Sequence, residues 1–246
     1  MISKILLLSS IFLLFMKADT IEVFSATATK LAMEEMKEAF LETRPNDKIN
    51  LHIGAAGKAY SQFQSGMNYD IFFSADRSYP EAIVKDGQSS SEITVYAYGQ
   101  LTLYSFDKNL LKNDLSSLND KNIKKISIAN PRLAPYGLAA LEIIEKQPNS
   151  DNIKTKLVLG DNVAQAAHFV DTGAAEIGFI PYALLKNNQN TKGSYVLLNE
   201  SLYSPLEHCF VVTKYGTDKK LVKDFYTFVL SNKGKKIIEK HGFKAP

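Results

Sequence analysis

The fold is decided by the stretch Ile126-Ser-Ile-Ala-Asn-Pro-Arg-Leu-Ala-Pro-Tyr-Gly-Leu-Ala-Ala-Leu-Glu-Ile-Ile144. Its first four residues are typical of a buried strand, because they are mainly apolar and include two isoleucines. Asn130-Pro131 ends this strand, and a helical pattern begins near Tyr136-Gly137. The first turn of a helix has backbone N–H groups without intrahelical acceptors and carries the positive end of the helix dipole. The stretch therefore predicts a strand-to-helix junction that can bind an anion.

Three more helices are predicted to start directly after a strand or short turn, near Thr27-Ala28-Thr29, Gly57-Lys58 and Asn162-Val163. The small side chains of Gly54-Ala55-Ala56-Gly57 let backbone amides approach a ligand closely, although a plain tight turn explains the same pattern. This segment is not a P-loop, because the second glycine and the Ser/Thr after the lysine are missing at the required spacing. In open α/β sheets such junctions gather at the ligand crevice, beyond the carboxyl ends of the strands.

Strand and helix patterns alternate almost throughout the chain. Val163, Ala166, Ala167 and Val170 follow the helical period, as do Met33, Met36 and Phe40. The alternation predicts an α/β fold whose parallel sheets are covered by helices on both faces. The predicted strands are Ile21 to Phe24, Ile49 to Ile53, Tyr69 to Phe73, Thr94 to Tyr98, Leu101 to Ser105, Lys125 to Ala129, Lys156 to Leu159, Ile177 to Ile180, Tyr195 to Leu198 and Glu207 to Thr213.

Residues 1–18 have the pattern of a cleavable secretory signal peptide. Lys4 precedes an apolar run from Ile5 to Met16, and the small residue Ala18 follows. The run of about 12 residues is shorter than the roughly 20 that a membrane-spanning helix needs, and no cysteine follows it to accept a lipid. We therefore expect a mature protein in the periplasm.

Charge and cysteine content exclude several classes of function. Without Lys4 and Lys17, 27 basic residues stand against 26 acidic ones, and no basic stripe indicates a nucleic-acid surface. Cys209 is the single cysteine, so no internal disulfide or paired-cysteine metal site is expected. The four histidines lie on separate predicted elements without a carboxylate or second histidine at ligand spacing, which argues against a metal site. No cofactor is expected.

The junctions together resemble the periplasmic molybdate-binding proteins of ABC importers, which belong to the type II periplasmic binding protein class. The resemblance covers nearly the whole mature chain, in the expected order. It rests on Val23-Phe-Ser-Ala-Thr-Ala, Gly54-Ala-Ala-Gly-Lys-Ala-Tyr, Asp70-Ile-Phe-Phe-Ser-Ala-Asp, Ala129-Asn-Pro-Arg-Leu-Ala-Pro-Tyr-Gly, Asp161-Asn-Val-Ala-Gln-Ala, Gly173, Glu176-Ile-Gly-Phe-Ile, Phe225-Tyr-Thr-Phe-Val-Leu and Lys240-His-Gly-Phe.

The resemblance implies two lobes with the ligand in the cleft between them. The first lobe would comprise residues 19–97 and 207–246, and the second residues 98–206, with a hinge crossing at Tyr203 to Glu207. The lobes would close around the anion, and the closed form would deliver it to a membrane permease driven by an ATPase. The resemblance implies a binding protein and not an enzyme, and we expect a monomer without a nucleic-acid partner.

The resemblance also implies the residues that contact the oxyanion, through its oxygens and not as direct metal ligands. Thr27 would give a hydroxyl, and Ala28, Ala56, Tyr136 and Val163 would give mainly backbone N–H groups. Gly57, Asn162 and Tyr182 are secondary candidates. The family usually has a hydroxyl or amide side chain in place of Ala28 and a serine in place of Ala56, so this chain lacks two side-chain donors.

A tetrahedral dianion suits such a site. Molybdate and tungstate carry no proton at neutral pH, so a pocket of donors fits them, whereas protonated phosphate would leave an O–H without an acceptor. Sulfate shares these properties, and sulfate or a small carboxylate therefore remains an alternative ligand. A sensor of such a ligand for a membrane partner is a further possibility.

A secreted hydrolase is the alternative from another functional class. Thr27 would act as nucleophile and Lys30 as base, by analogy with serine–lysine acyl enzymes, but the companion motifs of that chemistry are missing. Thr27 or Thr29 can equally cap the first helix.

Overall fold

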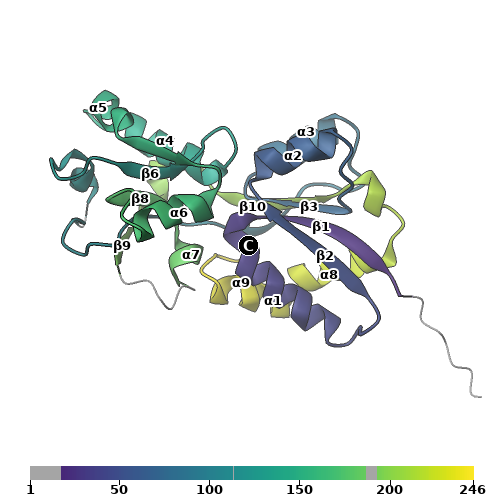
Figure 1. Ribbon diagram of the computed structural model, residues 1–246. Coiled ribbons are helices and arrows are strands. Elements are labelled where there is room, and N and C mark those ends of the chain that lie inside the picture. Colours follow the sequence, from purple (N-terminus) through teal and green to yellow (C-terminus); the bar gives the residue numbers. More distant parts are fainter. Residues whose placement is uncertain (1–17, 113, 187–192) are drawn as a thin grey trace, which may run out of the picture.

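The computed structural model describes residues 18–112, 114–186 and 193–246 and shows an α/β fold with two five-stranded sheets (Figure 1). The predicted signal peptide, apart from Ala18, and the loop predicted at Asn187 to Lys192 lie outside these residues. None of the helices in the described ranges combines the length and the apolar character needed to cross a membrane.

The first sheet has the strand order β2-β1-β3-β10-β4. Strand β1 is parallel to both β2 and β3, whereas β10 is antiparallel to β3 and β4. We call this sheet and its helices the first lobe. Its strands are β1 (Thr20–Ala26), β2 (Lys48–Gly54), β3 (Ile71–Ser74), β4 (Thr94–Tyr98) and β10 (Glu207–Val212).

The second sheet has the strand order β7-β6-β8-β5-β9. Strand β6 is parallel to β7 and β8, and β5 is antiparallel to β8 and β9. We call this sheet and its helices the second lobe. Its strands are β5 (Leu101–Ser105), β6 (Ile126–Ala129), β7 (Leu157–Gly160), β8 (Ile177–Pro181) and β9 (Ser194–Leu197).

All ten predicted strands are present, with ends that differ by at most two residues, and the predicted α/β fold is confirmed, with sheets that are parallel only in part. Each sheet is mixed, because β5 and β10 run antiparallel to their neighbours. A parallel neighbour needs a crossover connection, usually a helix, that returns the chain to the same end of the sheet. Strands β5 and β10 instead follow the two segments that cross between the lobes.

Helices cover both faces of the first sheet: Figure 1 shows α2 and α3 on one side and α1, α8 and α9 on the other. Gly242 follows α9 with a φ of 86°, a left-handed conformation that glycine adopts readily at the end of a helix. The helical elements of this lobe are η1 (Thr27–Thr29), α1 (Lys30–Leu41), α2 (Ala56–Gln64), α3 (Ser78–Lys85), η4 (Lys214–Gly216), α8 (Lys220–Leu230) and α9 (Asn232–Lys240).

In the second lobe α4 and α6 both pack against β6 and β8. The buried residues of α6, Val163, Ala166 and Val170, keep the predicted helical spacing. The helical elements of this lobe are η2 (Leu115–Asn119), α4 (Pro135–Glu145), α5 (Ser150–Thr155), α6 (Val163–Asp171), α7 (Tyr182–Lys186) and η3 (Glu200–Leu202).

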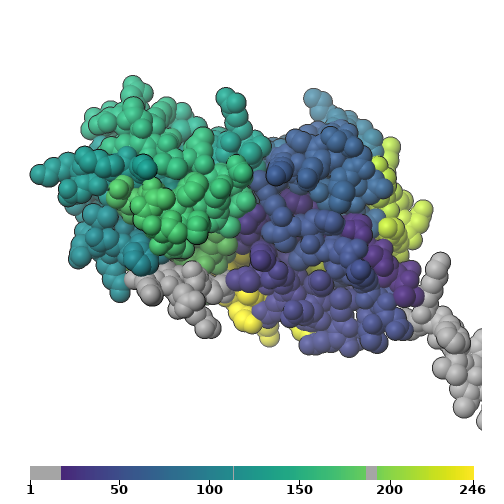
Figure 2. Space-filling view, in the orientation of Figure 1, coloured from purple at the N-terminus to yellow at the C-terminus, as the bar shows by residue number. Residues whose placement is uncertain are grey.

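The chain crosses between the lobes twice. The first crossing joins β4 to β5 through Gly99 and Gln100, and the second leads from η3 into β10. The two crossings are hydrogen-bonded to each other, because the backbone N–H of Gly99 donates to the carbonyl oxygen of Leu206 at 2.9 Å. Figure 2 shows the two lobes meeting along one seam. We call the two crossings together the hinge, after the hinge that the resemblance implies at the return crossing.

Candidate functional site

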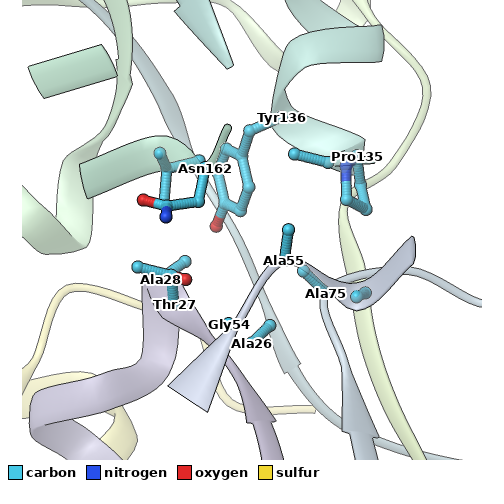
Figure 3. A pocket seen from close by; sticks show the side chains of 12 residues that line it. Ala26, Thr27, Ala28, Gly54, Ala55, Ala75, Pro135, Tyr136 and Asn162 are labelled. Atoms are coloured by element: carbon cyan, nitrogen blue, oxygen red, sulfur yellow. The ribbon is translucent and has the colours of Figure 1, made fainter. Parts of the chain in front are cut away.

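A small hollow lies between the two lobes (Figure 3). Its empty space is about 240 Å³, which includes the part that opens to solvent. The lining residues come from both lobes and are Ala26, Thr27, Ala28, Gly54, Ala55, Ala56, Ala75, Ala134, Pro135, Tyr136, Asn162 and Val163.

All four predicted junctions meet at this hollow. In the first lobe, η1 follows β1 directly, and α2 begins at Ala56, two residues after β2. In the second lobe, α4 begins at Pro135. Proline is tolerated at the first position of a helix because the backbone N–H that it lacks would have no intrahelical acceptor there. Helix α6 begins at Val163, shortly after β7. The carboxyl ends of the strands thus direct the first turns of the following helices to one space, as open α/β sheets do.

The backbone N–H groups of Ala56, Tyr136 and Val163 are available as donors. Each belongs to the first turn of a helix, where N–H groups have no intrahelical acceptor. Among the backbone hydrogen bonds outside the helices and strands, none within the described part of the chain uses these three groups. Together with Ala28 in the η1 turn, they place donors from both lobes around the hollow.

Asn162 both caps α6 and lines the hollow. Its Oδ1 accepts hydrogen bonds from the backbone N–H groups of Ala164 at 2.9 Å and Gln165 at 3.1 Å. With Oδ1 engaged, the Nδ2 group is the part of the side chain that can donate to a ligand. The cap also fixes the first turn of α6, so that the N–H of Val163 remains directed away from the helix body.

Thr27 supplies a hydroxyl at the hollow, and the prediction that Thr27 or Thr29 caps the first helix was wrong. Neither η1 nor α1 has a side-chain cap. The Thr29 hydroxyl instead donates to the carbonyl oxygen of Ala26 at 2.9 Å, and it shares a hydrogen bond of 2.7 Å with Ser25. The Thr27 hydroxyl makes no hydrogen bond to any other described residue, so it remains free to bind a ligand.

The geometry does not favour the hydrolase interpretation. The Lys30 Nζ lies 3.9 Å from a Glu34 carboxylate oxygen, and the Lys30 side chain is 53% exposed. Thr27 and Lys30 share no hydrogen bond among the contacts of the described residues, so the nucleophile–base pair is not assembled.

Two secondary candidates do not line the hollow. The backbone N–H of Gly57 donates to the carbonyl oxygen of Leu133 at 3.1 Å, so it joins the lobes and is not free for a ligand. The Tyr182 N–H donates to the carbonyl oxygen of Gln100, and its ring packs against Tyr195, with the two ring centroids 5.7 Å apart. It lies at the start of α7, beside the hinge crossing and outside the set that lines the hollow.

Three alanines and one proline at the hollow were not identified from the sequence: Ala26, Ala75, Ala134 and Pro135. Two of them, Ala26 and Pro135, adjoin residues that were predicted. Ala75 directly follows β3, which lies beside β1 in the sheet. Its position after a central parallel strand is the signal that could have identified it, because the carboxyl ends of neighbouring parallel strands share one edge.

No charged side chain is among the residues that line the hollow. Lys58 and His52 of the first lobe line a wider adjoining groove together with Asp161 of the second. Within residues 18–112, 114–186 and 193–246, no group of three or more His, Cys, Asp or Glu side chains is arranged to hold a metal ion. The hollow therefore offers hydrogen-bond donors and helix N-termini, a combination that suits an anion.

Comparison with known proteins agrees with this arrangement. The molybdate-binding protein ModA of Azotobacter vinelandii is 31% identical over 230 residues, which cover 92% of this chain and 90% of that protein. ModA of Rhodobacter capsulatus is 30% identical over 226 residues, covering 90% and 88%. The solved structure of the periplasmic molybdate-binding protein of A. vinelandii superposes with a TM-score of 0.84 at 27% identity, covering 92% of this chain and 99% of that one.

Other solved structures share the fold at lower identity. The sulfate-binding protein SubI of Mycobacterium tuberculosis superposes with a TM-score of 0.78 at 11% identity, covering 92% of this chain and 87% of that one. A family model described as bacterial extracellular solute-binding protein matches residues 21–244, almost all of the described chain. The chain belongs to the bacterial extracellular solute-binding protein family.

Proposed function

We propose that this protein captures molybdate or tungstate in the hollow between its lobes and delivers the anion to an ABC importer. The observation that carries the proposal is the convergence of four helix or turn starts, two from each lobe, on a space without charged side chains. Thr27, Ala28, Ala56, Tyr136 and Val163 would hold the oxyanion oxygens, and Asn162 would add a side-chain donor.

The chemistry of the hollow supports a small, fully deprotonated anion. Its available groups are N–H donors and the Thr27 hydroxyl, while the Asn162 carbonyl oxygen is already engaged in the α6 cap. A protonated phosphate would bring an O–H that finds no free carboxylate or amide oxygen there, at a cost of about 1–3 kcal/mol. The size of the hollow further favours a compact anion over a substrate with a carbon chain.

The names of the relatives support molybdate as the ligand. Two of them are named molybdate-binding proteins and cover nine-tenths of this chain. By analogy, the loaded protein would act in the periplasm, as a monomer without a cofactor, and would pass the anion to a membrane permease driven by an ATPase. Closure of the lobes around the anion would mark the loaded state for the permease. No catalytic step is required.

Elemental analysis of the protein as purified from cells tests the proposal without presupposing the ligand. We expect molybdenum or tungsten in close to equimolar amount. Calorimetric titration of ligand-free protein with molybdate, tungstate, sulfate and phosphate then tests selectivity, and we expect tight binding of the first two anions only. Sulfate binding at micromolar concentration or below would overturn the proposed selectivity. Labelling of Thr27 by an acylating probe would instead support a hydrolase.

A further inference from the structure

Tyr136 connects the proposed anion site to the hinge. Its backbone N–H lies in the first turn of α4, at the hollow, and its ring extends from α4 toward the first lobe (Figure 3). The Tyr136 hydroxyl and the Nε2 of His208 share a hydrogen bond of 3.0 Å. His208 is the second residue of β10, immediately after the return crossing. One residue thus contacts both the ligand space and the first lobe beside the hinge.

This hydrogen bond is fully enclosed. Tyr136 is 2% exposed and His208 is 0% exposed. Burial lowers the pKa of His208 to about 3, so the imidazole is neutral at physiological pH. Its other ring nitrogen, Nδ1, has no hydrogen-bond partner among the described residues. The Tyr136 hydroxyl is therefore the hydrogen-bond partner that this part of the chain gives the His208 ring, and its loss would leave a buried polar ring unsatisfied.

Gly99 of the first crossing makes room for this contact. A Cβ atom at Gly99 would lie 2.1 Å from the Tyr136 hydroxyl oxygen and 3.0 Å from His208 Nε2. Both distances are too short for a side chain, so the hydroxyl can reach His208 only because residue 99 is glycine. The backbone N–H of Gly99 also donates a hydrogen bond to Leu206 of the other crossing. The two crossings therefore pack together with Tyr136 and His208 at the hinge.

We infer that the Tyr136–His208 hydrogen bond forms only when the lobes are closed and that it couples anion capture to closure. Tyr136 moves with the second lobe and His208 with the first, so rotation at the crossings changes their separation. A hydrogen bond tolerates changes of only a few tenths of an ångström. An anion held by the Tyr136 N–H fixes the start of α4, which positions the ring for His208. Tyr136 is thus a positioning residue in addition to its proposed backbone contact; the coupling rests on the proposed function.

The test compares Tyr136→Phe with Tyr104→Phe. Phenylalanine at 136 keeps the backbone N–H and most of the ring but removes the hydroxyl. Tyr104 is a fully buried tyrosine of the second lobe whose hydroxyl donates to Asp171 of the same lobe at 2.7 Å, so its variant loses a buried hydroxyl without touching the hinge. The measurements are the dissociation rate of molybdate by stopped-flow fluorescence and the lobe separation of the ligand-free and loaded forms by small-angle scattering.

We expect Tyr136→Phe to release molybdate about tenfold faster and to bind it correspondingly more weakly, as loss of about 1.4 kcal/mol from the closed state implies. Tyr104→Phe should match the parent in both measurements. His208→Leu should behave like Tyr136→Phe, and the double variant should be no weaker than either single one, because the two residues act through one bond. Equal release rates and equal closure in Tyr136→Phe and Tyr104→Phe would overturn the inference.

Other variants test the same hydrogen bond if one variant has a folding defect. If Tyr136→Phe does not fold, His208→Leu and Gly99→Ala, which crowds the hydroxyl, address the same bond. Additive losses in the cycle would mean that the residues are not coupled. If the parent protein binds no molybdate, the proposed function fails. The inference fails alone if the parent protein binds molybdate and closes, while Tyr136→Phe closes to the same extent and releases molybdate at the same rate.

Discussion

The backbone N–H of Gly57 donates a hydrogen bond to the carbonyl oxygen of Leu133 at 3.1 Å, and this bond joins the two lobes beside the hollow. A second contact lies next to it, since the Tyr79 hydroxyl donates to the carbonyl oxygen of Arg132 at 3.4 Å. A Cβ atom at Gly57 would lie 3.1 Å from the Leu133 Cα and 2.5 Å from the Tyr79 hydroxyl oxygen. The close approach of the lobes therefore depends on glycine at this position.

Gly57→Ala should weaken anion binding without destabilising the protein. The added methyl group would crowd the Leu133 backbone of the second lobe, whereas the Tyr79 hydroxyl, its other close neighbour, is the end of a side chain that can turn away. We expect a loss of affinity of about tenfold, measured by calorimetry, with a melting temperature close to that of the parent. Unchanged affinity would show that the loaded form does not use the Gly57–Leu133 contact.

Asn162→Asp should keep the cap of α6 but weaken the binding of an anion. Aspartate keeps an oxygen that can accept from Ala164 and Gln165, so the melting temperature should stay near that of the parent. It also brings a negative charge to the hollow, and affinity for molybdate should fall at least a hundredfold.

Asn162→Ala is the matched control for this prediction. It removes the cap, which should cost about 1 kcal/mol of stability, but adds no charge, so its loss of affinity should be much smaller. Equal losses of affinity in the alanine and aspartate variants would contradict a site that binds negative charge beside Asn162.

Ala56→Ser should keep or tighten the binding of the oxyanion. The change preserves the backbone N–H at the start of α2 and adds a hydroxyl donor at the hollow, where the related family usually has serine. A hydrogen bond to a charged group contributes about 1.5–3 kcal/mol, so the gain can range from roughly tenfold to a hundredfold in affinity. A loss of more than tenfold in calorimetric titration would mean that Ala56 does not face the ligand.

The sequence predicted the local features of this site, because each depends on a few adjacent residues. The break after Ile126-Ser-Ile-Ala and the new helix near Tyr136 are visible in the pattern of apolar residues, proline and glycine. The helix starts at Val163 and at Ala56 are visible in the same kind of sequence pattern. That the four junctions face one hollow followed from the general placement of helix starts at the carboxyl edge of a sheet.

Other features depend on contacts between distant segments and could not be predicted. The Tyr136–His208 hydrogen bond joins residues 72 positions apart, and nothing near either residue indicates the other. The antiparallel directions of β5 and β10 depend on how the chain passes between the lobes. Thr29 was expected as a possible cap, but packing of β1 against the η1 turn directs its hydroxyl to Ser25 and Ala26 instead.

The low pKa of His208 predicts how stability depends on pH. Burial holds this pKa at about 3, whereas the ordinary value is 6.5. Between these values the unfolded chain binds a proton at this residue and the folded chain does not, so the free energy of unfolding falls as the pH falls from about 6.5 toward 3. The slope is at most about 1.4 kcal/mol per pH unit from this group.

Urea unfolding of the parent and of His208→Leu at pH values from 7.5 to about 4.5 checks this prediction. Carboxyl groups with lowered pKa, such as those of Glu22 and Glu35, lose their contribution below their ordinary value of 4.5. The other titratable groups are common to the two proteins, so the difference between their slopes over this window reports His208. The variant should lose less stability than the parent over the window. Identical slopes would contradict a neutral, buried His208.

The location of the anion is tested most directly by a crystal structure of the protein grown with molybdate, with anomalous diffraction to identify molybdenum. The account predicts one molybdenum peak in the hollow, with its oxygens within hydrogen-bond distance of the backbone nitrogens of Ala28 and Ala56 in the first lobe and of Tyr136 and Val163 in the second. A molybdenum peak outside the hollow, or contacts from one lobe alone, would contradict it.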